Sequence, residues 1–281
     1  MPEDWGDGIL TDLWPAGIRQ NQPSFIFPFI SDNKTMLEFT GRKAIVTGAT
    51  RGIGRAVAEA LLKQGATVCG VYGGDEKAAT EFREAMAGFG PRLRLTRLDV
   101  SDYQAAAQFF AAFEKEFDTL DILVNNAGIR RDAVLALMKE EDWRRVIDVN
   151  LTGGFIMSRL ALPLMLKQKY GRVIFITSPM GRLGFPGQAN YAAAKAGQVA
   201  MARSLCQEVA KRKITVNCVS PGFIDTGFIA NLTETQVKEY KKMVPAGRFG
   251  TPQEVAQAVL FLAGDVAAYI NGAVLEMTGG L

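Results

Sequence analysis

From Gly41 onward, short apolar runs alternate with helix-length segments, and this alternation restricts the possible folds more than any other feature. The apolar runs are continuous, which is typical of strands buried on both faces of a parallel sheet. Seven strands are predicted, over residues 43–47, 66–72, 92–98, 121–125, 172–177, 214–219 and 273–277. Helices are expected over residues 52–64, 76–88, 103–117, 139–169, 191–211 and 252–264. The predicted fold class is α/β, a single-domain doubly wound parallel sheet whose ligands bind beyond the carboxyl ends of the strands.

Residues 1–35 differ from the rest of the chain, because they hold four prolines and two of the three tryptophans without a sustained period. We expect an N-terminal extension that is poorly ordered, followed by one domain over residues 36–281. Two alternatives stay open. Translation could begin at Met36, directly before the regular pattern, or the extension could dock on a partner or a membrane surface.

The chain contains no histidine, which excludes every Ser-His, Cys-His and His-metal site, and we expect no metal. A net charge of +3, with basic and acidic residues interleaved, is too small to indicate nucleic-acid binding. Cys69, Cys206 and Cys218 are expected to be buried free thiols of a reducing compartment. No apolar run reaches the length of about 18 residues that a bilayer span needs. The N-terminus lacks the features of a secretory signal, so a cytoplasmic protein is expected.

The first predicted strand runs into a glycine-rich turn, Thr47-Gly-Ala-Thr-Arg-Gly-Ile-Gly54, at the start of the first predicted helix. Glycines let the backbone approach a pyrophosphate at the helix N-terminus, where free N–H groups and the helix dipole favour anions. The spacing is G-x-x-x-G-x-G, so its position between strand and helix carries the prediction of a Rossmann-type dinucleotide site. The residues of the turn expected to bind the dinucleotide are Gly48, Thr50, Arg51, Gly52, Ile53 and Gly54.

Two later strand ends are expected to continue this site. Asp99 and Val100 follow the third strand and are placed to meet the adenine. After the fourth strand, Asn125-Asn-Ala-Gly128 is interpreted as a backbone passage along the cofactor, with contacts from Asn126, Ala127 and Gly128. Alternatively, the two asparagines satisfy backbone groups between strands, and for Asn125 we favour that structural role.

The choice of dinucleotide depends on charge at the end of the second strand. An NAD site usually places an acid there to hold the ribose hydroxyls, but the strand ends in Tyr72, and Asp75 follows only after two glycines. Arg51 could face a 2′-phosphate, although it could also be a solvated residue at the helix start. The sequence therefore favours NADPH over NADH.

Tyr191 and Lys195 begin the helix after the fifth strand and, at i and i+4, lie on one face of it. A free phenol has a pKa near ~10, and a neighbouring cation favours the phenolate and brings that value toward neutral pH. Ser178 ends the fifth strand, where its hydroxyl can hold a substrate oxygen in line with Tyr191. Asn150 is a poor helix former inside a predicted helix, so it is either a cap or kink, or it holds a water behind Lys195.

These residues together resemble the short-chain dehydrogenase/reductase family, from about residue 38 to the C-terminus, so the catalytic domain would be residues 36–281. Within that family the chain looks most like the 3-oxoacyl-[acyl-carrier-protein] reductases. The stretches that carry the resemblance are Thr47 to Gly54, Asn125 to Asp132, Gly187 to Gly197 and Val219 to Thr226.

The resemblance implies a role for each matching residue. Tyr191 would donate a proton to the ketone, Lys195 would lower the tyrosine pKa and bind the nicotinamide ribose, Ser178 would orient the carbonyl, and Asn150 would anchor a proton-relay water. The segment bordering the nicotinamide would contribute Pro221, Gly222, Ile224 and Thr226. Family members are commonly tetramers, built through the long helices and the C-terminal strand.

The implied reaction is NADPH-dependent reduction of a 3-oxoacyl thioester in fatty acid synthesis. An acidic acyl carrier protein would dock on basic residues near the mouth of the site. Arg212 matches one such position, and Lys167 and Lys169 lie around the other, where an arginine is expected. Pro179, directly after Ser178, departs from the family pattern and puts the substrate in doubt. The alternatives are another ketone or alcohol, such as acetoacetyl-CoA, a sugar, a steroid-like alcohol or a polyketide, and a non-catalytic scaffold.

Overall fold

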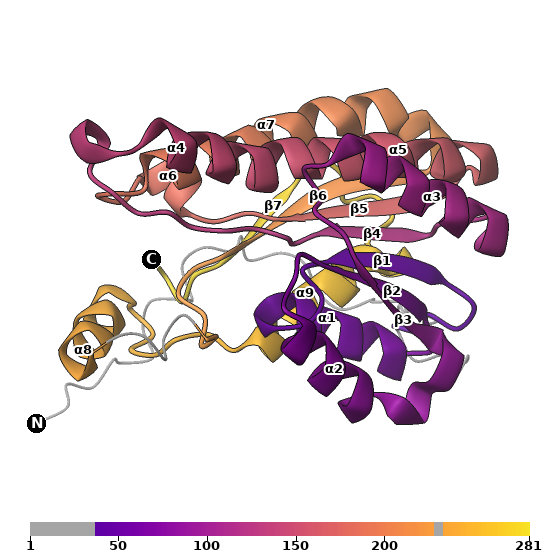
Figure 1. Cartoon of the computed structure of the whole chain (residues 1–281), viewed down its shortest axis with the longest axis horizontal. Helices are drawn as coiled ribbons and strands as arrows, with labels where there is room; N and C mark the ends of the chain where they lie inside the picture. The colour runs from indigo at the N-terminus through magenta and orange to yellow at the C-terminus, as the bar shows by residue number, and fades with distance from the viewer. Residues whose placement is uncertain (1–36, 228–232) are drawn as a thin grey trace, which may run out of the picture. The chain divides into compact units, whose positions relative to one another are not determined.

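The computed structural model describes residues 37–227 and 233–281, so the expectations for residues 1–35 lie outside the described part. A seven-stranded sheet with the order β3-β2-β1-β4-β5-β6-β7 forms its centre, and every pairing is parallel (Figure 1). The strands are β1 Lys43–Thr47, β2 Thr67–Tyr72, β3 Leu93–Arg97, β4 Ile122–Asn125, β5 Gly171–Ile176, β6 Ile214–Pro221 and β7 Val274–Met277. The predicted α/β fold class is confirmed, and the strand order reverses beside β1, where such sheets bind ligands.

Helices cover both faces of this sheet (Figure 1). One layer contains α1 Gly52–Lys63, α2 Glu76–Ala85 and α9 Pro252–Ala263; the other contains α3 Tyr103–Phe117, α4 Glu140–Ile147, α5 Gly153–Gln168 and α7 Ala189–Val209. Each layer encloses its own apolar cluster against the sheet. β5 and β6 are buried along their whole length, as their continuous apolar sequences predict.

Local sequence signals account for the ends of several helices. Asp102 caps α3 by accepting a hydrogen bond from the Ala105 N–H at 3.0 Å. Thr251 and Glu254 form a capping box around Pro252 at the start of α9. The short helices α6 Met180–Leu183 and α8 Glu234–Met243 were not predicted, because neither has a long apolar period.

The predicted helix over residues 139–169 is interrupted. A π-helical turn, η3 Asp148–Thr152, joins α4 to α5 and carries Asn150, so the expected kink at this residue takes the form of a π turn. The combined rod, Glu140–Gln168, is long and apolar enough to cross a membrane by length and composition, contrary to the sequence expectation. Over half of its most apolar window (56%) is buried inside the fold, as in a core helix of a soluble protein.

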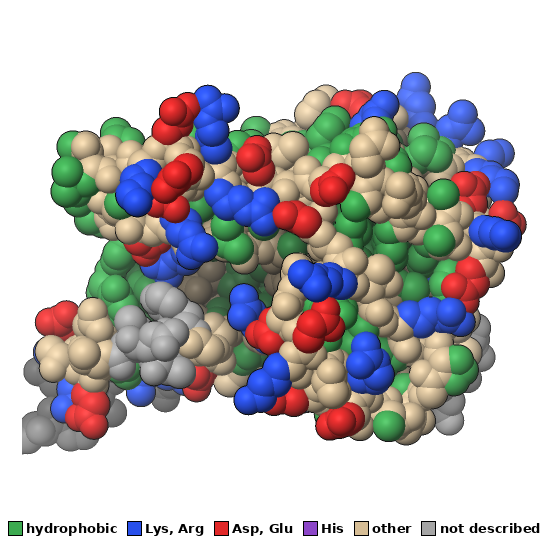
Figure 2. Space-filling model, viewed as in Figure 1, with side chains coloured by type: hydrophobic (Ala, Val, Ile, Leu, Met, Phe, Trp, Pro, Cys, Tyr) green, Lys and Arg blue, Asp and Glu red, His purple; other side chains and the backbone are tan. Residues whose placement is uncertain are grey.

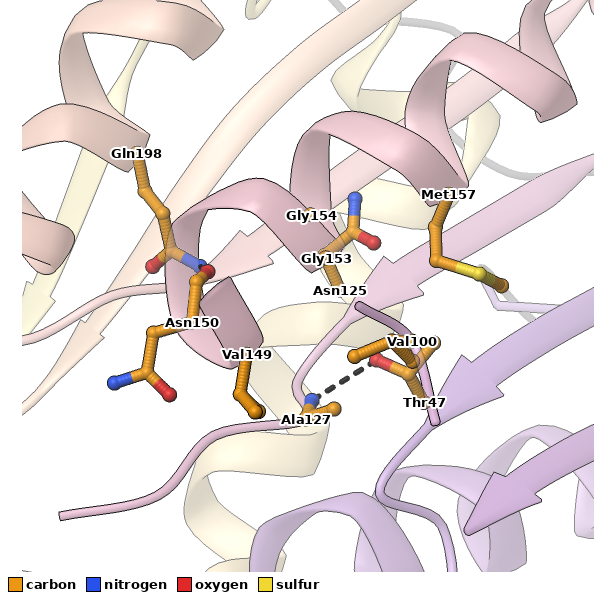
Figure 3. Close-up of a pocket in the computed structure, with 10 residues that line it drawn as sticks. All are labelled: Thr47, Val100, Asn125, Ala127, Val149, Asn150, Gly153, Gly154, Met157 and Gln198. Atoms are coloured by element: carbon orange, nitrogen blue, oxygen red, sulfur yellow. Dashed lines mark hydrogen bonds between the residues drawn. The ribbon is translucent and has the colours of Figure 1, made fainter. Parts of the chain in front are cut away.

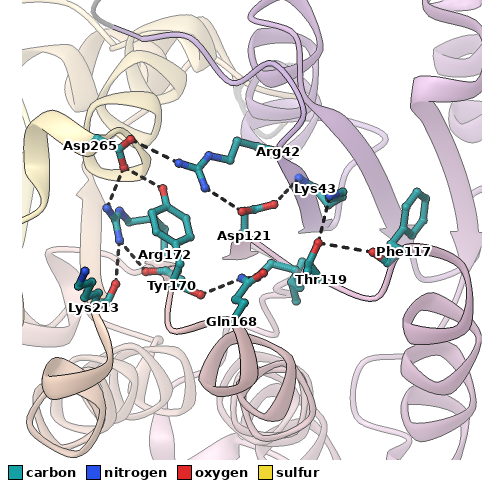
Figure 4. A network of polar contacts seen from close by, with 12 residues as sticks. Arg42, Lys43, Phe117, Thr119, Asp121, Gln168, Tyr170, Arg172, Lys213 and Asp265 are labelled. Atoms are coloured by element: carbon teal, nitrogen blue, oxygen red, sulfur yellow. Dashed lines mark hydrogen bonds and ion pairs between the residues drawn. The ribbon is translucent and has the colours of Figure 1, made fainter.

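A polar network lies at the amino-terminal ends of the strands, on the edge opposite the glycine turn (Figure 4). The ring of Tyr170 lies 4.0 Å from the Arg42 guanidinium and 4.3 Å from that of Arg172. Arg42 donates to Asp121 at 2.9 Å, and Arg172 donates to Asp265 at 3.1 Å. These contacts tie β1, β4 and β5 to the loop after α9.

The three cysteines are free and buried, as predicted.

Candidate active site

The turn between β1 and α1 can be built only with glycine at its critical positions. Gly48 and Gly52 have φ values of 65° and 53°, in the left-handed region. A Cβ on Gly54 would lie 2.1 Å from the Gly48 carbonyl oxygen. α1 begins at Gly52, the preceding Arg51 makes no side-chain cap, and the first turn has no acid, so its first N–H groups are available to an anion. The turn therefore fits a pyrophosphate.

Thr47 and Asn126 hold this turn against the end of β4, and Figure 3 shows the contact between Thr47 and Ala127. The Thr47 hydroxyl accepts hydrogen bonds from the N–H groups of Asn126 and Ala127, both at 2.9 Å. The Asn126 side chain donates to the carbonyls of Thr47 at 2.8 Å and Gly48 at 3.2 Å. Asn125 donates to the Ser158 hydroxyl of α5 at 3.0 Å.

Two arginines flank the end of β2, where the sequence analysis considered only one. Arg51 pairs with Asp75 at 3.7 Å, and Arg97 at the end of β3 pairs with Glu76 at 3.6 Å. All four side chains are largely exposed. Tyr72 donates to Glu76 at 2.9 Å. Arg97 could have been found from its place at the end of a strand beside the second one.

Asp99 is fixed in place at the end of β3. Burial would raise the pKa of its carboxyl, but hydrogen bonds from Ser101 and Arg145 together lower it below its ordinary value. The Ser101 hydroxyl and the Arg145 guanidinium lie 2.6 and 2.7 Å from its two oxygens. Val100 is buried and lines the recess drawn in Figure 3, together with Thr47.

Ser178, Tyr191 and Lys195 meet beyond the carboxyl end of β5. Ser178 follows this strand, and its hydroxyl acts on the Tyr191 phenol, whose pKa it lowers. Lys195 lies one turn after Tyr191 on α7, buried, with its ammonium 5.6 Å from the centre of the tyrosine ring. The ammonium donates to the Ile176 carbonyl at 2.7 Å, which ties α7 to β5. Pro179 begins α6 with helical backbone angles, directly behind Ser178.

Burial dominates the electrostatics of this cluster. It lowers the pKa of Lys195 from 10.5 to about 8. It raises the pKa of Tyr191 above its ordinary value, although the hydrogen bond with Ser178 and the charge of Arg130 act in the opposite direction. The sequence analysis expected Lys195 to lower the tyrosine pKa, whereas burial leaves that pKa above its ordinary value in the protein alone. At neutral pH the phenol is therefore protonated and able to act as an acid.

Asn150 is fully buried and uses its side chain on the main chain of Ile129. Its Oδ1 accepts from the Ile129 N–H at 2.7 Å, and its Nδ2 donates to the Ile129 carbonyl at 3.0 Å. The main-chain carbonyl of Asn150 accepts a hydrogen bond from Gln198 Nε2 at 2.6 Å. Gln198 was not predicted; its only signal is a polar residue inside the apolar part of the helix that carries Lys195.

The segment after β6 passes beside the glycine turn. The Thr226 methyl carbon lies 3.5 Å from the position that a Cβ on Gly52 would take. Pro221 ends β6, Gly222 donates to the Met277 carbonyl at 3.0 Å, and buried Ile224 bridges to Gly250. The site candidates from the glycine turn to Thr226 therefore gather at one edge of the sheet.

Comparison with known families identifies this arrangement. A family described as Enoyl-(Acyl carrier protein) reductase matches residues 48–281, which is most of the chain and all of the candidate site. The chain belongs to the short-chain dehydrogenase/reductase family. It is accordingly an oxidoreductase.

Individual members of the family match nearly their full lengths. The 3-oxoacyl-[acyl-carrier-protein] reductase FabG of Escherichia coli (strain K12) is 45% identical over 245 residues, covering 87% of this chain and 99% of that protein. FabG of Haemophilus influenzae is 46% identical over 242 residues, covering 86% and 98%. Nodulation protein G of a Rhizobium species (strain N33) is 42% identical over 247 residues, covering 88% and 99%.

The three residues expected to dock a carrier protein lie at the edge of the sheet opposite Ser178. Lys167 and Lys169 precede β5, and Arg212 precedes β6, whereas Ser178 follows β5. At about 3.3 Å per residue the six residues of β5 separate the two edges by roughly 20 Å. Lys167 also donates to Asp118 at 2.7 Å, which raises its pKa. Within one chain these residues do not border the mouth of the site, contrary to the sequence expectation.

Proposed function

We propose that the protein reduces a 3-oxoacyl thioester, on acyl carrier protein or coenzyme A, to the 3-hydroxyacyl thioester with NADPH. The observation that carries the proposal is the cluster of Ser178, Tyr191 and Lys195 at the sheet edge that also holds the glycine turn. The names of the FabG relatives supply the substrate class. The setting would be fatty acid synthesis by a soluble, cytoplasmic enzyme.

The side chains of the cluster suit carbonyl reduction. NADPH, when bound, supplies the hydride. Ser178 and Tyr191 each bring a hydroxyl to this cluster, and both would donate to the carbonyl oxygen, orienting the ketone and stabilising the charge that develops there. The buried phenol of Tyr191 gives its proton to that oxygen. The Lys195 ammonium lies beside the resulting phenolate and offsets its negative charge.

We propose NADPH rather than NADH because β2 itself ends without an acid, and the two acids that follow it, Asp75 and Glu76, are paired with Arg51 and Arg97. Tyr72 stands where an NAD site usually has a carboxylate, and Glu76 is held by the Tyr72 hydroxyl. Arg51 and Arg97 approach the two glycines from the turn and from β3, respectively. Their exposed guanidinium groups can form charge-assisted hydrogen bonds with a 2′-phosphate.

We also propose a homotetramer, and a docking surface for the carrier protein that depends on it. Large exposed apolar side chains stand on the helices and near the C-terminal strand, namely Trp143, Phe155, Leu166, Phe261, Val266 and Tyr269. Because Lys167, Lys169 and Arg212 lie at the far edge of their own sheet, they would serve a site only on another copy of the chain.

The test is to follow NADPH oxidation with a panel of substrates. We expect turnover of acetoacetyl-CoA and more efficient turnover of a 3-oxoacyl carrier protein. Sugars and cyclic ketones serve as alternative carbonyl substrates, and an enoyl-CoA tests the reaction named in the family description. Activity only on sugars or cyclic ketones would remove the thioester assignment, and activity only on the enoyl thioester would remove carbonyl reduction itself.

A further inference from the structure

Gln198 connects two residues of the site that belong to different elements. Its side-chain Nε2 donates to the main-chain carbonyl of Asn150 in the π turn at 2.6 Å. Its Oε1 accepts a hydrogen bond from the Lys195 ammonium at 3.1 Å. Gln198 is only 1% exposed, and Figure 3 shows its amide pointing at the turn that carries Asn150.

We propose that Gln198 is a positioning residue, whose amide holds the Lys195 ammonium beneath the Tyr191 ring and couples it to the π turn of Asn150. This inference rests on the proposed function, because it assigns a task within the same carbonyl-reducing site.

The chemistry of the link requires a side-chain amide. One end must accept from an ammonium and the other must donate to a carbonyl, and among side chains of this length only glutamine does both. A carboxylate offers no donor to the Asn150 carbonyl, and an apolar side chain offers neither group. Since the site is buried, either replacement leaves a polar partner without its hydrogen bond, which water replaces poorly there.

Gly154, in the first turn of α5, lies beside the Gln198 amide. A Cβ on Gly154 would lie 3.7 Å from Gln198 Nε2 and 3.2 Å from the Phe175 ring. The first turn of α5 therefore packs closely on β5, beside the Gln198 amide that extends from α7 to the π turn. In this place the amide oxygen meets the Lys195 ammonium and the amide nitrogen meets the Asn150 carbonyl.

Gln198 acts on Lys195 without adding a charge. The titratable groups that face the ammonium are the Tyr191 phenol on the same helix and the Cys218 thiol on β6. The other partners of the ammonium are neutral acceptors, the Ile176 carbonyl and the Gln198 amide oxygen. Removing the amide oxygen weakens the charged form of Lys195, whereas a carboxylate in its place strengthens it.

The experiment compares Gln198→Leu and Gln198→Glu in the full chain. The Lys195 ammonium is titrated by NMR of its ¹³Cε signal, assigned with Lys195→Met, and kcat and KM are measured with NADPH and acetoacetyl-CoA. Gln207→Leu is the matched control, because Gln207 is exposed on the same helix and donates only to the Arg203 carbonyl at 3.1 Å. Its titration and its kinetics should equal those of the unsubstituted protein.

We expect the Lys195 pKa to move down in Gln198→Leu and up in Gln198→Glu. In Gln198→Leu, kcat should fall about tenfold with KM within about twofold, since a displaced ammonium affects chemistry more than substrate binding. Coincident titrations in all the folded proteins, together with unchanged kcat, would overturn the proposal. If Gln198→Leu does not fold, the Gln198→Glu titration decides, because that side chain keeps the length and one oxygen.

Failure of the proposed function gives a different pattern. An unsubstituted protein that reduces no carbonyl compound would remove the catalytic setting, while opposite shifts of the Lys195 titration would still establish the link to Gln198. A protein that reduces acetoacetyl-CoA, with titrations insensitive to residue 198, would leave the function standing and remove this inference alone.

Discussion

The Lys195 ammonium lies 5.6 Å from the centre of the Tyr191 ring and is anchored to the Ile176 carbonyl, not to the phenol oxygen. Lys195 is therefore held by the main chain of β5, while the Tyr191 phenol interacts with Ser178. Each residue has a separate partner, so removing one leaves the other in place. This separation makes the contribution of each residue measurable.

The first prediction concerns pH. Burial lowers the pKa of Lys195 to about 8 and raises that of Tyr191, so Lys195 is the first of the two to lose its proton as pH rises. Below about pH 8 the ammonium is charged and reduction should proceed at its full rate; above it, kcat/KM should decline. A pH profile of acetoacetyl-CoA reduction checks this, and a flat profile up to pH 10 would contradict it.

The second prediction concerns the glycine turn. Gly54→Ala would bring a methyl carbon within 2.1 Å of the Gly48 carbonyl oxygen, so the turn must open. We expect NADPH affinity to fall at least about a hundredfold and the free energy of unfolding to drop by about 1–3 kcal/mol. Gly88→Ala, where a Cβ meets no atom within 4 Å, is the control. NADPH fluorescence titration of both variants measures the effect; equal affinities would refute the role of the turn.

The third prediction concerns the choice of cofactor. Arg51→Ala and Arg97→Ala should each raise KM for NADPH by about 10- to 100-fold, the equivalent of a charge-assisted hydrogen bond, and leave KM for NADH unchanged. Arg55→Ala is the matched control, because Arg55 pairs with Glu59 along α1 at 2.8 Å. A preference of the unsubstituted protein for NADH would overturn this part of the proposal.

The fourth prediction separates stability from activity. Asp121 is 7% exposed and accepts from Arg42 and from the Lys43 N–H, both at 2.9 Å, far from the catalytic edge. Asp121→Ala should lower the free energy of unfolding by about 1–3 kcal/mol, a fall in Tm of about 3–10 °C, with kcat within twofold. The exposed pair of Asp118 and Lys167 is the comparison, and Lys167→Ala should not change Tm measurably. Calorimetry of both variants tests the difference.

The sequence predicted the sheet and its major helices because their signals are local. The helix over residues 103–117 has the observed bounds, since Asp102 caps it and its apolar residues follow the helical period. At Asn150 the sequence indicated a cap or kink, or a residue that holds a water, but not a π turn, because the π turn depends on packing between α4, α5 and α7. α8 was missed, since a capping box before a polar helix resembles a surface loop in sequence.

Site residues that are neighbours along one helix were easier to predict than site residues that the fold brings together from distant parts of the chain. Tyr191 and Lys195 share a helix face, so their proximity follows from spacing. The contacts of Gln198 and Arg97 could not be predicted, because their partners lie on the π turn and after β2, which only the fold brings beside them. The pKa of Tyr191 could not be predicted either, because burial depends on everything that packs around the residue.

The central claim is that the Tyr191 phenol supplies the proton to the reduced carbonyl, and Tyr191→Phe tests it most directly. This substitution removes one hydroxyl and keeps the ring beneath which Lys195 lies. The measurement is kcat for acetoacetyl-CoA with NADPH, with cofactor binding followed separately to show that the site is intact. We predict a fall in kcat of about 10²- to 10⁴-fold with cofactor affinity retained. Undiminished turnover in this variant would contradict the account.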